Sequence, residues 1–77
     1  MSNMAKTVSG RLVIKILCRE FGFFLISQKG SHVKLRRLVQ ARHITTIVPL
    51  HKELAHGTLR GVLNLAEINE ADFWSKV

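Results

Sequence analysis

The apolar positions between residues 10 and 21 repeat with the spacing of an α-helix. They recur three and four residues apart, and the set is Leu12, Val13, Ile16, Leu17 and Phe21. Ser9 precedes this stripe and can accept a hydrogen bond from a free backbone N–H of the first turn. Gly22 suits the left-handed backbone that ends many helices. The pattern predicts a helix from about Gly10 to Phe21.

The next three segments have the composition of β-strands. Residues 23–28 (FFLISQ) are rich in strand formers and too few for a second helix, although apolar side chains fall on both faces. Residues 43–48 (HITTIV) are largely β-branched, and Pro49 ends them because proline cannot donate to a β-ladder. Residues 31–38 alternate between apolar and polar positions, as a half-buried strand does. We predict three strands in one antiparallel sheet.

The alternation gives the middle strand a basic face. Val33 and Leu35 fall on one side of this strand. The other side carries His32, Lys34 and Arg36. The turn to the next strand, within residues 37–42, contains no Gly, Pro, Asn or Asp, so the sequence signals this hairpin only weakly.

Two further helices are indicated near the C-terminus. The first has Thr58 as its expected cap. Its apolar stripe consists of Leu59, Val62, Leu63 and Ala66. Asn69, followed three residues later by Asp72, resembles a capping box and predicts a last short helix over the aromatic residues 73–74. The element order α-β-β-β-α-α is typical of an α+β domain with helices on one face of an antiparallel sheet.

Length and composition limit the possible protein classes. A chain of 77 residues makes one domain, of which we expect residues 1–8 to be a flexible arm. A hydrophobic content of 47% argues against disorder, and the single cysteine, Cys18, excludes an internal disulfide. The longest apolar run is residues 23–26, so no membrane span fits, and residues 1–10 contain no apolar signal core. These features predict a cytoplasmic protein.

The charge of the chain is unevenly distributed. The 12 Lys and Arg side chains oppose 5 Asp and Glu, for a net charge of +7. Residues 1–60 hold all but one of the basic side chains and only two of the acidic ones. A basic body on a small domain suggests a polyanionic partner, most often nucleic acid. An acidic partner protein, or a surface that merely keeps the chain in solution, would also account for this charge.

Histidine is the main reactive residue type in the chain. The four are His32, His43, His51 and His56. The last two stand five residues apart in an expected loop, a loose match to zinc-ligand spacing, and no glycine-rich phosphate loop is present. Cys18 adjoins the apolar stripe of the first helix, where a structural thiol is usual. We therefore expect neither a metal nor a small-molecule cofactor.

His32 differs from the other histidines in its surroundings. It follows a Gly-Ser pair at the start of the basic strand, with Lys29 just upstream. Imidazole can give or take a proton near neutral pH, and neighbouring cations can hold a phosphate group. RNA supplies its own nucleophile, the 2′-hydroxyl, so a nuclease can act without a metal. From the residues alone, a catalytic His32 and an ordinary exposed strand histidine both remain open.

Several short motifs occur in an order that resembles one family. The motifs are Ser9-Gly10, Leu17, Gly22-Phe23, Gln28-Lys29-Gly30-Ser31-His32, Val48-Pro49-Leu50-His51, Glu53-Leu54 and Gly57-Thr58-Leu59. In this order they resemble the HicA family of mRNA interferase toxins over about residues 9–73. The resemblance implies a double-stranded-RNA-binding-domain-like fold, with a three-stranded antiparallel sheet packed on two helices. It also implies an endoribonuclease that cleaves mRNA, arrests growth and is neutralised by a HicB-like antitoxin covering its active site.

The resemblance also implies roles for individual residues. The catalytic histidine of the family corresponds to His32. Gly30 and Ser31 correspond to the turn that presents it, and Lys29 to a basic position before the motif. With the charge pattern, this implies RNA contacts by Lys29, Lys34, Arg36 and Arg37. A non-catalytic RNA-binding module, or an inactive toxin that only binds its antitoxin, is the alternative.

Two regions depart from the family pattern. Phe24 stands where a polar residue is common, and Ser27 where a basic or polar one is. We therefore expect either that Phe24 is exposed or that the first strand is shifted by one residue. The hairpin between Arg36 and His43 lacks the usual Gly or Asp, which leaves its length and register open. Neither departure removes the motif histidine.

Overall fold

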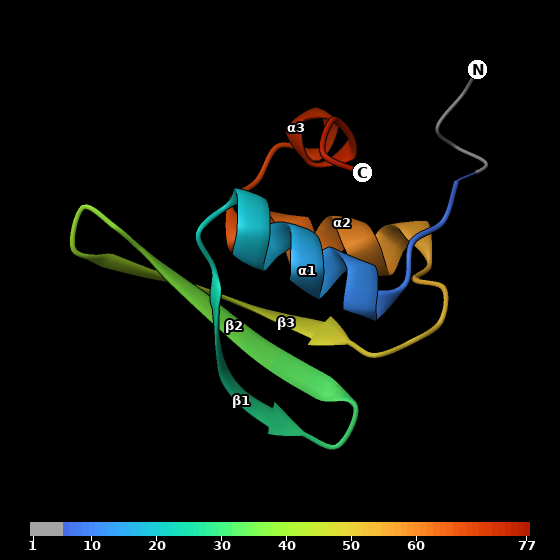
Figure 1. Ribbon diagram of the computed structural model, residues 1–77, viewed down its shortest axis with the longest axis horizontal. Helices are drawn as coiled ribbons and strands as arrows, with labels where there is room; N and C mark the ends of the chain where they lie inside the picture. Colours follow the sequence, from blue (N-terminus) through green and yellow to red (C-terminus); the bar gives the residue numbers. More distant parts are fainter. Residues whose placement is uncertain (1–5) are drawn as a thin grey trace.

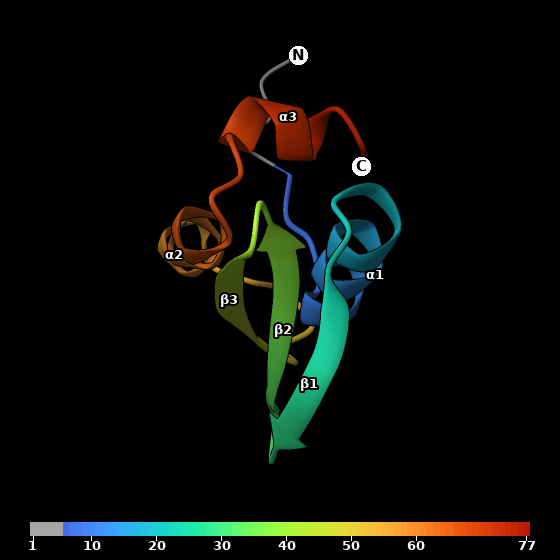
Figure 2. The ribbon, with the colours of Figure 1, turned by 90° about the vertical axis from the view of Figure 1, so that its left-hand side faces the viewer.

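The computed structural model describes residues 6–77 (Figure 1). It contains helices α1 (Gly10–Glu20), α2 (His56–Ala66) and α3 (Glu70–Trp74), and strands β1 (Phe24–Lys29), β2 (His32–Val39) and β3 (Arg42–Pro49). The strands form one antiparallel sheet in the order β1-β2-β3. Figure 2 shows α1 on the β1 side, α2 on the β3 side, and α3 above the space between these two helices. The predicted α+β, double-stranded-RNA-binding-domain-like fold is confirmed, and each strand lies within one residue of its predicted bounds.

Helix α1 begins and ends as its sequence predicts. The Leu12 N–H donates to Ser9 Oγ at 3.0 Å, which satisfies one of the free donors of the first turn. At the other end, Gly22 takes a φ of +74°, and the Phe21 N–H donates to the Leu17 carbonyl. The apolar stripe faces the core, because Val13, Ile16 and Leu17 are buried.

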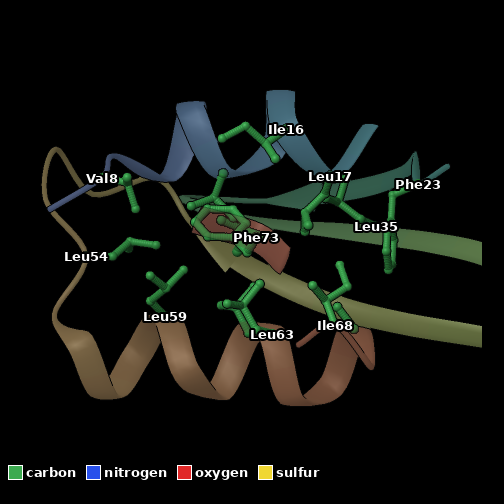
Figure 3. Close-up of a cluster of buried hydrophobic side chains, with 14 of the residues drawn as sticks. Val8, Ile16, Leu17, Phe23, Leu35, Leu54, Leu59, Leu63, Ile68 and Phe73 are labelled. Carbon is green, nitrogen blue, oxygen red and sulfur yellow. The ribbon is translucent and has the colours of Figure 1, made fainter. Parts of the chain in front are cut away.

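The hydrophobic core lies between the sheet and the two long helices. The sheet contributes Val33, Leu35, Ile44 and Val48, and α2 contributes Leu59, Val62, Leu63 and Ala66. Phe73 of α3 is fully buried and fills the centre between α1 and α2 (Figure 3). Trp74 is half-buried and meets the Phe73 ring edge-on, with 5.6 Å between centroids. None of the helices within residues 6–77 is long and apolar enough to cross a lipid bilayer.

Two expectations are wrong: the cap residue of α2 and the flexibility of Val8. Thr58 does not cap α2, because the helix already begins at His56 and its N-cap residue is Ala55, which makes no side-chain hydrogen bond. Val8, assigned to the flexible arm, is buried, and its carbonyl accepts a hydrogen bond from the Leu54 N–H at 2.8 Å. An apolar side chain and a backbone partner together order this residue. Residues 1–5 of the predicted arm lie outside the described residues.

Both hairpins of the sheet have turns of two residues. The β1–β2 turn consists of residues 30–31, and only Gly30 has a positive φ, of +59°. This pattern matches a type II′ turn. The β2–β3 turn consists of Gln40 and Ala41, which both have positive φ, of +50° and +65°, as in a type I′ turn. The hairpin that the sequence signals weakly is therefore as short as the other.

Candidate active site

The strand register defines which residues lie on the face of the sheet that the helices leave open. Directly opposed residues of an antiparallel sheet share a face. Three successive rows on this face are Lys29–His32–Pro49, Ser27–Lys34–Ile47 and Phe24–Arg36–Thr45. We call these three rows the outer face. The structure thus brings the predicted site residues of β1 and β2 onto one surface, with Arg37 as the exception.

A pocket of about 470 Å³ opens on the outer face. It is lined by Ser27, Lys29, His32, Lys34 and Ile47. His32 therefore lines one pocket together with two lysine side chains and one serine side chain. Such a set can hold a phosphate group by charge while the imidazole moves a proton. Ser27 and Ile47 were not predicted as site residues, although the buried positions 44, 46 and 48 of β3 place Ile47 on the outer face.

The β1–β2 turn places His32 as the first residue of β2. Gly30 occupies the left-handed region, which favours glycine. The side-chain Nε2 of Gln28 donates to the Gly30 carbonyl at 2.9 Å. On the other side, the Leu50 N–H donates to the Ser31 carbonyl at 2.7 Å. One hydrogen bond thus comes from β1 and the other from the residue that follows β3, so the backbone that carries the imidazole is supported on two sides.

Three segments that are distant in sequence meet beside this turn. Gly10 packs directly against the end of β3, where any Cβ would overlap the Pro49 carbonyl oxygen. The Gly10 N–H donates to the His51 carbonyl at 2.9 Å. Pro49 is in turn the cross-strand partner of His32. The start of α1, the β1–β2 turn and the end of β3 thus form one backbone junction that supports the candidate catalytic residue.

The outer face is positively charged. None of the three strands contains an Asp or a Glu, so the sheet itself offers no carboxylate to neutralise Lys29, Lys34 and Arg36. The Nε of Arg36 donates to Thr45 Oγ1 at 3.0 Å, which fixes that guanidinium against β3. Its terminal nitrogens carry further N–H donors that suit phosphate oxygens.

Arg37 does not join this surface. Its guanidinium donates to the carbonyls of Phe21, at 3.2 Å, and Ala66, also at 3.2 Å, and lies 5.0 Å from the centroid of the Phe23 ring. A cation is favourable at these carbonyl-rich helix ends. The prediction that Arg37 contributes to the basic face is therefore wrong. The sequence already indicated this position, because Arg37 is two residues from the buried Leu35 and alternate residues of a strand share a face.

Phe24 lies on the outer face because β1 contains a bulge. The ladder pairs Leu25 with Leu35 but Ser27 with Lys34, so Ile26 is an extra residue. The extra residue shifts the strand by one position, and Phe24 pairs with Arg36 instead of facing the helices. The side chain of Phe24 is 47% exposed. Both expectations for this residue, exposure and a one-residue shift, hold together.

The other reactive side chains do not line this pocket. His43 pairs with Leu38 near the far hairpin. Burial raises the pKa of the Cys18 thiol, which disfavours the nucleophilic thiolate. Within the part of the chain that the structure describes, no three His, Cys, Asp or Glu side chains are placed to share a metal ion.

Comparison with known families supplies a match for most of this structure. A family model described as the HicA toxin of bacterial toxin-antitoxin matches residues 10–68, which is well over half of the chain. The chain belongs to the HicA toxin family. No significant match was found among curated proteins or among solved structures.

The HicA match contains the whole candidate active site. It begins at the first residue of α1 and extends past the end of α2, so it includes the complete sheet and both hairpins. Helix α3, which brings Phe73 into the core, follows the matched HicA region. As a member of a family of toxins from toxin–antitoxin systems, the HicA chain has an antitoxin as its partner.

Proposed function

We propose that this HicA toxin is a metal-independent endoribonuclease that cleaves mRNA and uses His32 as its general acid or base. One observation carries the proposal: His32, Lys29 and Lys34 line a single pocket on a sheet face without acidic residues. The pocket offers a proton-transfer group and two phosphate-binding cations within one cavity. The family supports the same conclusion, because a toxin needs an activity that its antitoxin restrains.

The proposed reaction uses the 2′-hydroxyl of the RNA as the nucleophile. Lys29 and Lys34 bind the scissile phosphate and stabilise the charge that develops on it. His32 takes the proton from the 2′-hydroxyl, or gives one to the departing 5′-oxygen. The 2′-oxygen forms a bond to phosphorus, and the bond from phosphorus to the 5′-oxygen breaks. The products are a 2′,3′-cyclic phosphate and a 5′-hydroxyl.

We further propose that the antitoxin is a HicB-like protein that covers this pocket. The support is electrostatic, because a face with three basic side chains and no carboxylate on its strands attracts an acidic protein as well as RNA. Both partners would then compete for the same cations. Cleavage of mRNA and its control by an antitoxin place the toxin in the cytoplasm, and free toxin would arrest growth.

RNA cleavage in EDTA by the purified toxin tests this proposal. The wild type should cut, and His32→Ala should reduce the rate by about 10²–10⁴-fold, the usual contribution of a general acid or base. His43→Ala is the matched control, because it removes an imidazole from the same side of the sheet but outside the pocket. It should cut like the wild type.

Three results would contradict the proposal. Equal cutting by the wild type and His32→Ala would identify a different catalytic group or a contaminant. Products with a 5′-phosphate and a free 3′-hydroxyl would exclude attack by the 2′-oxygen. RNA that is bound but left intact by the wild type would indicate a non-catalytic RNA-binding module or an inactive toxin.

A further inference from the structure

The outer face carries exposed apolar side chains between its cations. Phe24 is 47% exposed and stands beside Arg36. Ile47 is 42% exposed, stands beside Lys34 and forms part of the pocket that contains His32. Phosphate binding needs the cations alone and gives no reason for apolar side chains among them. The apolar groups therefore indicate a second type of contact within the same ligand.

Phe24 and His32 lie on the same face at a separation that follows from the register. Arg36, the partner of Phe24, is four residues from His32 along β2. Four residues of a β-strand span about 13 Å. The row of Ser27, Lys34 and Ile47 lies between them. The face therefore presents, in order, the candidate catalytic group, an apolar pocket wall and an aromatic ring, with a basic side chain on each row.

We propose that the outer face binds unpaired RNA lengthwise, with a base of a neighbouring nucleotide stacked on the Phe24 ring and the base at the cleaved linkage packed against Ile47. This inference rests on the proposed ribonuclease function and specifies its substrate class as single-stranded RNA. Lys34 and Arg36 bind the backbone phosphates between the two bases. Phe24 is a binding residue here and takes no part in the chemistry.

The chemistry of the face favours a single strand over a duplex. Stacking on an aromatic side chain needs a base whose flat face is free, and in a duplex both faces are already stacked. Sheets that bind unpaired RNA combine exposed aromatic rings with a basic surface, as this sheet does. Duplex recognition depends instead on sugar and phosphate contacts across grooves and needs no aromatic ring.

Fluorescence anisotropy with a labelled oligouridine tests the inference. The protein carries His32→Ala so that the RNA stays intact. Adding Phe24→Ala should weaken binding by about tenfold or more, the usual effect of removing one stacking side chain. Phe24→Leu should weaken it as well, because it keeps apolar area without a π-face. Phe24→Trp should retain the affinity.

The matched control is Leu25→Ala. Leu25 is the next residue of β1 and is 60% exposed, but it pairs with the buried Leu35 and lies on the opposite side of the strand. Its substitution should leave oligouridine binding unchanged. The same oligouridine annealed to oligoadenine should bind at least about tenfold more weakly than the single strand, because its bases are not free to stack.

The outcomes separate this inference from the proposed function. Absence of cleavage by the wild type would contradict the ribonuclease, whereas the binding series uses protein that does not cut. Equal oligouridine affinity of the Phe24→Ala and Phe24→Trp proteins would overturn the stacking contact. Equal affinity for duplex and single strand would overturn the substrate class. Loss of antitoxin binding without any change in RNA binding would show that Phe24 serves a protein interface instead.

Discussion

The turns at the two ends of the β-sheet are equally short, but different interactions stabilise them. At the end that holds His32, glycine supplies the positive φ, and hydrogen bonds from Gln28 and Leu50 hold the turn. At the other end, Gln40 and Ala41 both adopt positive φ, which costs a residue with a Cβ roughly 1–2 kcal/mol. Figure 1 shows this second hairpin extending beyond the helices.

The ends also differ in how they are joined to the helices. The site end is joined through backbone atoms, where Gly10 meets Pro49 and donates to the His51 carbonyl. The far end is joined through long side chains, namely Arg37 at the carbonyl ends of the helices and the ion pair between Arg42 and Glu67. Backbone contacts tolerate less displacement than flexible side chains. Changes at the site end should therefore alter activity and stability together, and changes at the far end should alter stability alone.

Gly10→Ala tests the backbone junction and should have the largest effect on stability. A Cβ at this position overlaps the Pro49 carbonyl, so the start of α1 or the end of β3 must move. We expect the free energy of unfolding to fall by about 2–3 kcal/mol. Cleavage should fall as well, because Pro49 is the strand partner of His32. Urea denaturation and a cleavage assay measure the two effects.

Gly61→Ala is the matched control for this substitution. Gly61 lies inside α2, and an added Cβ there meets no atom within 4 Å. It should raise the free energy of unfolding by about 0.5–1 kcal/mol, because alanine loses less backbone entropy in a helix. Equal destabilisation by both substitutions would refute the close contact at Gly10.

The double substitution Gln40→Asn and Ala41→Gly tests the far hairpin. Asn-Gly is the favoured pair for a type I′ turn, because both residues adopt positive φ at low cost. We expect the free energy of unfolding to rise by about 1–2 kcal/mol. The cleavage rate should stay unchanged, because the turn lies at the opposite end of the sheet from His32. A gain in stability accompanied by lost activity would contradict the independence of the two ends.

The ion pair at the far end predicts a small dependence of stability on pH. Hydrogen bonding from Arg42, at 2.7 Å, lowers the pKa of the Glu67 carboxyl below its usual range. A lowered pKa in the folded state contributes stability above the unfolded pKa, and this contribution disappears as pH falls through the folded value. Glu67→Gln should therefore be slightly less stable than the wild type at pH 7. The difference should vanish well below about pH 4, where the wild-type carboxyl is protonated.

Local sequence patterns predict most of this fold. The alternation of Val33 and Leu35 identifies the buried face of β2, and the helical spacing of apolar residues identifies α1 and α2. The turn at Gln40 and Ala41 was not predictable from its residues, because neither favours positive φ. Pairing of the flanking strands imposes that conformation. The start of α2 was misplaced because its N-cap residue makes no side-chain hydrogen bond.

The candidate site also contains residues that local sequence predicts and residues whose position depends on strand pairing. The motif around His32 and the alternation in β2 are local, so the imidazole and Lys34 are found from sequence. The outward position of Phe24 depends on where β1 is bulged against β2, which is a long-range property of two strands. Arg37 is the opposite case. Its place in the alternation of β2 assigns it to the same face as the buried Leu35, but the basic composition of the segment favoured the outer face.

The bulge at Ile26 allows β1 to contain one extra residue without changing which side chains lie on the outer face. Removing Ile26 would leave a regular ladder in which Leu25 still opposes Leu35 and Phe24 still opposes Arg36. A gap at position 26 in an alignment of related toxins is therefore structurally silent. A gap between Ser27 and His32 is not, because it would either shorten the two-residue turn before His32 or move Ser27 to the other face of β1. A change in the length of this strand is thus tolerated at the bulge, whereas a change next to the turn would rearrange the pocket around His32.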